Sequence, residues 1–119
     1  MPRKYRIAVV PGDGIGPEVV RQAQRILDKT AELIRGLHLE FEIHEAGAKF
    51  WLKNGRRREW DPETFERCKD ADAIFLGAIG LPGATYSDGR AVGGEVVFGL
   101  RLGLDLYANV RPVKLLEGT

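Results

Sequence analysis

The sequence has little of several features that would place a protein in a specialised class. Its 119 residues include one cysteine, Cys68, so no disulfide can form within the chain, and a reducing compartment is the simplest setting. No apolar run approaches the roughly 18 residues that a membrane span needs. The first residues also lack the apolar core of a signal peptide. These absences favour a cytoplasmic protein with no membrane partner.

The sequence also lacks an excess of charge of either sign. Eighteen lysines and arginines oppose 17 aspartates and glutamates, which leaves a formal net charge of +1. The basic run at residues 53–59 lacks the wide basic face and stacking platforms of a nucleic-acid site, so we expect a solvated loop and no nucleic-acid partner. Trp51 and Trp60 flank this run and are expected to pack at the edge of the core.

Histidines and cysteines are too few to form a metal centre by themselves. His38 and His44 are the two histidines, and no cysteine or aspartate cluster accompanies them at metal-ligand spacing. Cys68 has no neighbouring histidine–acid pair that would activate it as a nucleophile. We therefore expect no metal site and no catalytic residue within this segment.

What the sequence does contain is an alternation of strand and helix patterns. Short β-branched or alternating runs predict strands, and apolar spacings of three and four predict helices. The predicted order is strand 5–10, helix 16–36, strand 37–47, a short helical turn 48–55, helix 61–71, strand 71–80, loop 81–93, helix 94–105 and strand 106–116 interrupted at Pro112. This order predicts an α/β fold with a layered, mostly parallel sheet and helical crossovers. The alternating strand 37–47 is expected near a sheet edge.

We expect residues 1–119 to be one unit without an internal boundary. The sequence shows no repeat and no low-complexity tract. The last predicted strand has no closing element after it, which suggests an early stop within a larger protein.

A glycine cluster follows the first predicted strand. Gly12, Gly14 and Gly16 have the spacing G-x-G-x-G, whereas the dinucleotide-binding fingerprint is G-x-G-x-x-G. Pro17 breaks that fingerprint, and the charge of Asp13 would repel a phosphate. A structural strand-to-helix turn and a ligand-contacting loop both remain open, and a phosphate cradle is disfavoured.

Two further features allow a functional and a structural interpretation. Arg101 and Arg111, on a predicted helix and the next strand, could hold two carboxylates, although an internal ion pair with Asp105 or Glu95 is favoured by the residues alone. The glycines after the strand 71–80 could border a ligand, because ligands bind beyond the carboxyl ends of parallel strands. An ordinary flexible loop is an equal alternative.

Three stretches taken together resemble a known family. "IAVVPGDGIGPEVV", "AIFLGAIGLPG" and "LRLGLDLYANVRPVK" occur in this order in the β-decarboxylating dehydrogenases, which act on isopropylmalate, isocitrate, homoisocitrate or tartrate and D-malate. The resemblance covers nearly the whole chain and about the first third of a typical member. It implies the N-terminal part of the isopropylmalate dehydrogenase-like fold.

The resemblance also implies an activity. Members oxidise a 2-hydroxy dicarboxylic acid with NAD or NADP and release its β-carboxylate as carbon dioxide, with Mg2+ or Mn2+ stabilising the enolate. NAD is the expected cofactor here, and the metal ligands are expected beyond residue 119. The expected partners are a small dicarboxylate substrate and a second copy of the full-length chain, while the segment alone is expected to be inactive.

Site residues follow from the same resemblance. Arg101 and Arg111 resemble the arginines that hold the substrate carboxylates, which replaces the interpretation as an internal ion pair. Val97 and Phe98 would form an apolar wall of the substrate site. The residues expected to border the cofactor are Gly14, Ile15, Gly80, Leu81, Pro82, Gly94 and Glu95.

The residues before Arg101 bear on the choice of substrate. Isocitrate enzymes place a serine and an asparagine where this chain has Glu95 and Val97. An acid there would repel a γ-carboxylate, so 3-isopropylmalate is the first expectation. Gly93 and Gly94, together with Glu95, depart from the isopropylmalate pattern. Tartrate or D-malate, isocitrate, homoisocitrate and a non-catalytic regulatory module therefore remain alternatives.

Overall fold

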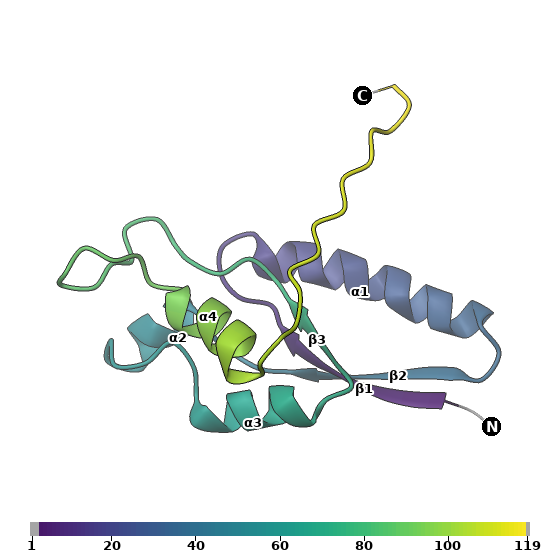
Figure 1. The fold of residues 1–119 in the computed structure, drawn as a ribbon, viewed down its shortest axis with the longest axis horizontal. Coiled ribbons are helices and arrows are strands. Elements are labelled where there is room, and N and C mark those ends of the chain that lie inside the picture. The colour runs from purple at the N-terminus through teal and green to yellow at the C-terminus, as the bar shows by residue number, and fades with distance from the viewer. Residues whose placement is uncertain (1–2, 119) are drawn as a thin grey trace.

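The structure, a computed structural model, describes residues 3–118. Its sheet has three parallel strands, β1 (Arg3–Val10), β2 (Leu37–Ile43) and β3 (Ala73–Leu76), in the order β2-β1-β3. The predicted α/β class and parallel sheet are therefore confirmed (Figure 1). Residues 1, 2 and 119 of the predicted unit lie outside the described part.

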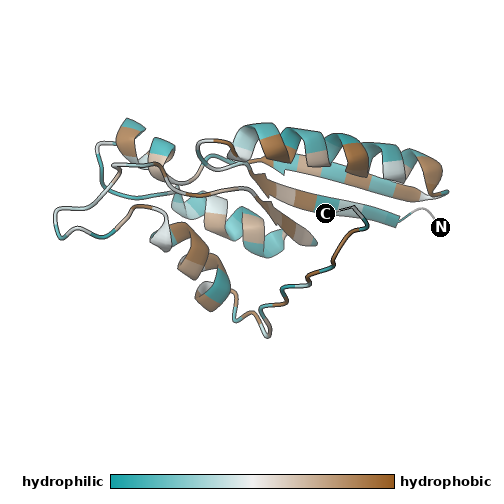
Figure 2. Ribbon diagram, turned by 90° about the horizontal axis from the view of Figure 1, so that it is seen from above, coloured by the Kyte–Doolittle hydropathy of each residue, from teal (hydrophilic) through white to brown (hydrophobic). Residues whose placement is uncertain are grey.

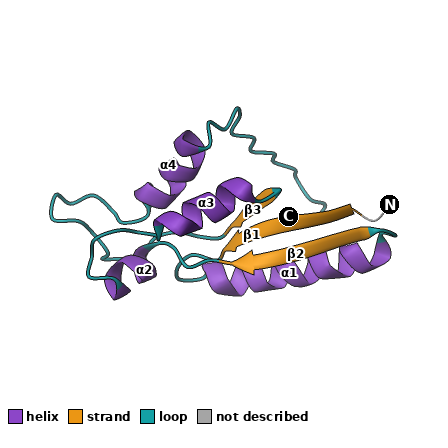
Figure 3. Cartoon of the chain, turned by 90° about the horizontal axis from the view of Figure 1, so that it is seen from below, coloured by secondary structure: helices purple, strands orange, loops and turns teal. Residues whose placement is uncertain are grey.

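Helices cover both faces of this sheet (Figures 1 and 3). Helix α1 (Gly16–Leu33) lies on one face, and α3 (Pro62–Asp70) and α4 (Gly94–Gly103) lie on the other. The short α2 (Ala48–Lys53) follows β2. Because successive residues of a strand point to opposite faces, Ala8 and Val10 enter the core beneath α3 and α4, while Val9 between them is fully buried on the other side.

Local signals in the sequence account for where the helices begin. Pro17 occupies the first turn of α1, where its missing N–H is not needed. Asp61 is the N-cap of α3, and its carboxylate accepts a hydrogen bond from the Glu63 N–H at 3.0 Å, with Pro62 as the first helical residue. Both helix starts agree with the sequence-based prediction.

The helix α1 and the strand β2 are less buried than the other core elements. The strand β2 is an edge strand of the described sheet, as its alternating pattern predicted. On the predicted apolar face of α1, Val20 is buried, but Leu27 stays 37% exposed. Further apolar side chains of α1 lie outside the predicted apolar face and are exposed: Val19, Ile26 and Leu33.

The predicted strand at residues 106–116 is wrong. This segment has no regular secondary structure and extends away from the sheet (Figure 1), with apolar and polar residues alternating along it (Figure 2). Its side chains are exposed, Tyr107 and Val113 almost completely. A strand needs a neighbouring backbone to satisfy its N–H and C=O groups, and none of the three described strands lies beside it.

Smaller differences concern boundaries. The strand predicted over 71–80 covers only Ala73–Leu76, and the helix predicted over 94–105 ends at Gly103. None of the helices within residues 3–118 has the length and apolar character to cross a membrane.

Candidate functional site at the carboxyl edge of the sheet

All three strands end at the same edge of the sheet because they are parallel (Figure 3). The loops that follow them, residues 11–15, 44–47 and 77–93, therefore gather at that edge. In open parallel sheets ligands bind beyond the carboxyl ends of the strands, so this edge is the candidate site. The sequence places the glycine turn and the loop 81–93 here.

Asp13 ties these loops together. Its side chain is buried, and its carboxylate accepts hydrogen bonds from the backbone N–H groups of Ala48 at 2.7 Å, Lys49 at 2.8 Å and Gly80 at 2.8 Å. The first two N–H groups belong to the first turn of α2, whose N-cap is Gly47 and has no side chain to cap it. A carboxylate at a helix N-terminus satisfies unpaired donors and interacts favourably with the helix dipole.

The glycines of the first turn serve close packing. Gly12 has a φ of +77°, and a Cβ atom there would collide with the carbonyl oxygen of Ala78. The N–H of Asp13 donates to the same oxygen at 2.7 Å. Because the Asp13 carboxylate points inward and already holds three N–H groups, this turn is a structural joint and not a phosphate cradle. Gly14 and Ile15, at its tip, are exposed.

The loop 81–93 is packed against the body of the protein. Thr85 and Ala91 form an isolated antiparallel bridge, which folds the loop back on itself. Ala84 and Val92 are buried with residues of α2 in a second apolar cluster. In the same cluster, the rings of Tyr86 and Trp51 meet edge to face with centroids 5.4 Å apart. These contacts hold both arms of the loop against the body of the protein, while residues 87–91 at its tip are exposed.

Glu59 is the second buried carboxylate of this edge. It is fully buried, and it accepts hydrogen bonds from the Tyr86 hydroxyl at 2.9 Å, the Gly93 N–H at 2.7 Å and the Val96 N–H at 3.2 Å. Desolvation, followed by the hydrogen bond to Glu59 and its negative charge, raises the pKa of Tyr86 to about 12. The tyrosine therefore remains a proton donor to Glu59 at neutral pH.

Helix α4 presents the expected substrate residues on one face. Gly94, Val97, Phe98 and Arg101 are separated by three, four and seven residues and so share a face of the helix. The opposite face is buried through Val96 and Leu100. Phe98 is 58% exposed and Arg101 is exposed, so this face is open to a ligand.

The two arginines have no internal partner among residues 3–118. Neither Arg101 nor Arg111 forms an ion pair within that range, and both are exposed. The carboxylate of Glu95 instead accepts the N–H of Glu59 at 3.0 Å. The alternative of an internal ion pair with Asp105 or Glu95 is therefore wrong. Arg111 lies in the extended segment 106–116, and the structure does not join it to α4.

Several of the expected cofactor residues are neighbours in space. A Cβ atom on Gly14 would lie 3.8 Å from Leu81, and one on Gly80 would lie 3.4 Å from the carbonyl oxygen of Val92. The first turn, the loop after β3 and the start of α4 thus form one continuous surface. Exposed Ile15 and Pro82 border this surface, and Leu81 is half-buried between them.

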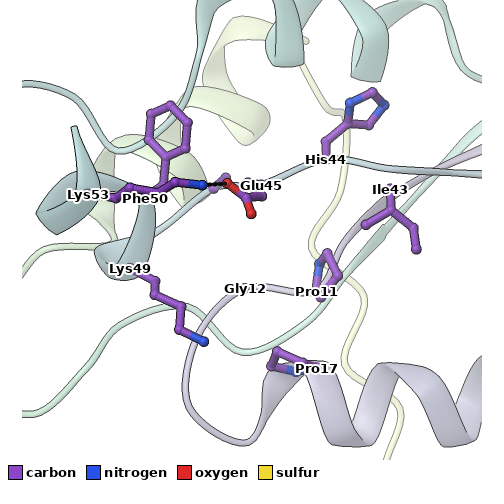
Figure 4. A pocket seen from close by; sticks show the side chains of 10 residues that line it. Pro11, Gly12, Pro17, Ile43, His44, Glu45, Lys49, Phe50 and Lys53 are labelled. Carbon is purple, nitrogen blue, oxygen red and sulfur yellow. Dashed lines mark hydrogen bonds and ion pairs between the residues drawn. The ribbon is translucent and has the colours of Figure 1, made fainter.

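A cleft of about 470 Å³ lies on the other side of the first turn. It separates that turn from the end of β2 and from α2 (Figure 4). Lys53 forms an ion pair with Glu45 across its rim at 3.1 Å. Its lining residues are Pro11, Gly12, Pro17, Ile43, His44, Glu45, Ala46, Lys49, Phe50 and Lys53, and none of the residues expected to bind substrate or cofactor is among them.

The described residues differ in how well they fit a metal and a dinucleotide. Within residues 3–118, no group of three or more His, Cys, Asp or Glu side chains could hold a metal ion. An apolar ring, in contrast, fits the surface made by Ile15, which is 64% exposed, and Leu81 beside the Cβ-free backbone of Gly14. The binding of a cofactor ring at this surface stays a prediction.

Sequence reasoning missed the roles of Asp13 and Glu59. Asp13 stood out only as a charge that disfavours phosphate, and Glu59 as the end of a basic run. No local pattern marks either residue, because their partners lie between 27 and 67 residues further along the chain. Trp51 and Trp60, expected at the edge of the core, are buried within the two apolar clusters.

Comparison with known proteins points to one family. A sequence model of the isocitrate/isopropylmalate dehydrogenase family matches residues 6–119. A 3-isopropylmalate dehydrogenase of Aquifex aeolicus is 45% identical over 118 residues, which cover 95% of this chain and 30% of the relative. A probable tartrate dehydrogenase/decarboxylase of Agrobacterium vitis is 37% identical over 120 residues, which cover 98% of this chain and 31% of the relative.

The fold gives the same result. The crystal structure of a β-decarboxylating dehydrogenase from Thermococcus kodakarensis, in its apo form, matches with a TM-score of 0.65 and 34% identity. The match covers 87% of this chain and 27% of that structure. The chain thus spans about a third of the length of the curated relatives that it matches.

Proposed function

The chain belongs to the isocitrate/isopropylmalate dehydrogenase family, and from this premise we propose that it forms the N-terminal part of an enzyme that oxidises and decarboxylates a 2-hydroxy dicarboxylic acid. We propose 3-isopropylmalate as the substrate and NAD as the oxidant. The observation that carries this proposal is the exposed face of α4, on which an arginine lies beside two apolar side chains.

That face suits a substrate with both a carboxylate and an alkyl group. The guanidinium of Arg101 would bind a carboxylate through two parallel hydrogen bonds, since no internal acid competes for it. Val97 and Phe98, one turn earlier on the same face, would contact the alkyl group and exclude water from it. Arg111 would hold the second carboxylate if the segment 106–116 folds back in the full-length enzyme.

The edge surface next to α4 suits the cofactor. Ile15, Leu81 and Pro82 would place their apolar side chains against the nicotinamide ring, and the glycines at 14, 80 and 94 allow close approach of the backbone. When bound, NAD supplies the hydride acceptor. These residues would orient the ring toward the α4 face, and the metal ligands are expected beyond residue 119.

Tartrate or D-malate is the second candidate substrate. Glu95 lies in the first turn of α4 beside this face, and its carboxylate is directed to the backbone of Glu59. The start of α4, Gly93, Gly94 and Glu95, offers less apolar surface to a substrate than larger apolar side chains would. This suits a substrate without an alkyl group. The resemblance to a probable tartrate dehydrogenase/decarboxylase supports the same candidate.

A substrate panel on the full-length enzyme tests the proposal. The purified protein, with NAD and Mg2+, is offered 3-isopropylmalate, D-malate, tartrate and isocitrate, and the reduction of NAD is followed by absorbance. We expect the highest kcat/KM for 3-isopropylmalate. A higher value for D-malate or tartrate would select the second candidate, and reduction with none of the four would refute the proposed activity.

We further propose that residues 1–119 are one continuous part of a cytoplasmic, homodimeric enzyme. The apolar side chains exposed on α1 and along the segment 106–116 support contacts with other parts of such an assembly, because extended apolar surface usually marks an interface. Analytical ultracentrifugation of the full-length protein measures its mass directly. A monomer at micromolar concentration would contradict the dimer.

A further inference from the structure

Glu59, like Asp13, is a buried carboxylate with no cationic partner among residues 3–118. Its side chain is completely buried. One carboxylate oxygen accepts from the Tyr86 hydroxyl and the Gly93 N–H, and the other accepts from the Val96 N–H. A buried carboxylate costs stability unless such donors surround it, so its partners indicate what it does.

Two of the three partners are backbone N–H groups at the start of α4, those of Gly93 and Val96. The N-cap residue of this helix is Gly93, which has no side chain to bind those groups. The carboxylate of Glu59 takes that place from 34 residues earlier in the chain. In return, the carboxylate of Glu95 in the first turn of α4 accepts the Glu59 N–H at 3.0 Å. Glu59 is therefore tied to the first turn of α4 twice: its carboxylate accepts N–H groups of Gly93 and Val96, and its own N–H donates to Glu95.

The third partner links the helix to the loop 81–93. Tyr86 donates its hydroxyl to the same oxygen that holds Gly93, and its ring packs against Trp51 of α2. Glu59 therefore fixes the start of α4 relative to the packed loop. The first residue after the capped turn that faces outward is Val97, and Arg101 follows one turn later on the same face.

We propose that Glu59 is a positioning residue for the dicarboxylate site: by capping α4 and holding Tyr86, its buried carboxylate sets the direction of the helix face that carries Val97, Phe98 and Arg101. This inference rests on the proposed function for the identity of the ligand. A substrate carboxylate bound by a planar guanidinium depends on the angle of that group, so a small rotation of α4 weakens binding without removing any contacting residue.

The test compares Glu59→Gln with Glu63→Gln in the full-length enzyme. Glutamine keeps the volume of Glu59 but turns an N–H donor toward one of its donor partners. Glu63 lies four residues away on the exposed start of α3, where it pairs with Arg67. Kinetic constants are measured with 3-isopropylmalate and NAD, well below the unfolding temperature of each variant.

We expect Glu59→Gln to raise the KM for 3-isopropylmalate about tenfold, a change typical of a misdirected charged contact, with less than a threefold change in the KM for NAD. Glu63→Gln should leave both constants unchanged. A Glu59→Gln enzyme with a lower melting temperature but unaltered kinetic constants would show that the residue only stabilises the fold, and would overturn the proposal.

Two further measurements keep the test informative. Tyr86→Phe removes one hydrogen-bond donor to Glu59 and keeps the ring contact with Trp51. It should therefore raise the KM for 3-isopropylmalate less than Glu59→Gln does. In the double variant with Glu59→Gln it should cause little further increase in that KM. If the Glu59→Gln enzyme does not fold, Tyr86→Phe alone decides: an unchanged KM overturns the proposal. Hydrogen exchange of residues 93–97 should accelerate in Glu59→Gln while exchange in α1 does not change.

The exchange experiment separates the two proposals. If the wild-type enzyme oxidises none of the acids, the proposed function fails, but exchange still reports whether Glu59 holds α4. Unaltered exchange at residues 93–97 in Glu59→Gln would overturn the positioning role, whatever the enzyme oxidises.

Discussion

The carboxylate of Asp13 accepts a hydrogen bond from the backbone N–H of Gly80 at 2.8 Å, although 67 residues separate the two. The same carboxylate binds the first turn of α2. One side chain thereby joins the segments that follow β1, β2 and β3. The candidate site is built on loops, and these hydrogen bonds give the loops a fixed arrangement.

Asp13→Asn should destabilise the protein without changing its shape. The amide keeps one acceptor oxygen but turns an N–H group toward backbone donors, and an unsatisfied buried polar group costs about 1–3 kcal/mol. Urea unfolding measures the difference. Asp28→Asn, on the exposed side of α1, is the matched control and should stay within about 0.5 kcal/mol of wild type. Equal effects of the two variants would contradict the assigned role of Asp13.

The variants Gly12→Ala and Gly55→Ala distinguish two costs of an added Cβ atom: strain of the backbone at positive φ, and collision with a neighbouring atom. Both glycines have positive φ, +77° and +69°, which costs an alanine roughly 1–2 kcal/mol. At Gly55 nothing lies near the added Cβ, whereas at Gly12 it meets the Ala78 carbonyl oxygen. Gly12→Ala should therefore lose about 1–3 kcal/mol more in free energy of unfolding. Similar losses would mean that the turn can move away from Ala78.

Arg101→Ala in the full-length enzyme should lower kcat/KM for the dicarboxylate substrate. Loss of a charge-assisted pair costs roughly 2–5 kcal/mol of transition-state binding, and the exposed arginine leaves the fold unaffected. Arg25→Ala on α1, where the arginine only contacts Gln22, should keep the wild-type value. Near-normal turnover by Arg101→Ala would remove this arginine from the substrate site.

Phe98→Ala should discriminate between the two candidate substrates. Phe98 is 58% exposed, so its removal should hardly change stability. If its ring contacts the isopropyl group, kcat/KM for 3-isopropylmalate falls roughly 10- to 200-fold, which corresponds to about 1–3 kcal/mol of transition-state binding. The kcat/KM for D-malate changes much less. Leu52→Ala, at an exposed position of α2, controls for general loss of apolar surface. A parallel fall for both substrates would argue against contact with the alkyl group.

The raised pKa of Tyr86 predicts a loss of stability at high pH. Burial and the hydrogen bond to Glu59 raise this pKa from 10.0 to about 12, so the folded state holds the phenolic proton more tightly than the unfolded state. This contribution is complete below pH 10 and disappears as the pH rises toward about 12. The melting temperature of wild type should fall more steeply over this range than that of Tyr86→Phe. Parallel curves would contradict the raised pKa.

Much of the fold could be predicted because its signals are local. The apolar run before Pro11, the proline and aspartate at the start of α3 and the alternating strand β2 each act within a few residues. The segment 106–116 has the same kind of signal but no strand. Its backbone groups need a partner strand, and a sequence pattern cannot supply one.

The candidate site also combines features that the sequence predicts with features that only the tertiary structure shows. Helical spacing places Val97, Phe98 and Arg101 on one face, and the resemblance to the family predicts that all three contact the substrate. It could not show that Arg101 is free of Asp105 and Glu95, because that depends on where the Glu95 side chain is directed.

By itself the sequence determined the order of strands and helices as far as α4, the parallel sheet and the family, since these follow from local patterns and ordered motifs. Only the tertiary structure decided that the first glycine turn is a joint, that the loop 81–93 is packed, and that Asp13 and Glu59 hold the site together. The physical reason is that a buried carboxylate binds whichever donors lie near it in space, and these need not be near it in the sequence. Those partners lie on elements that approach each other only when the sheet has formed.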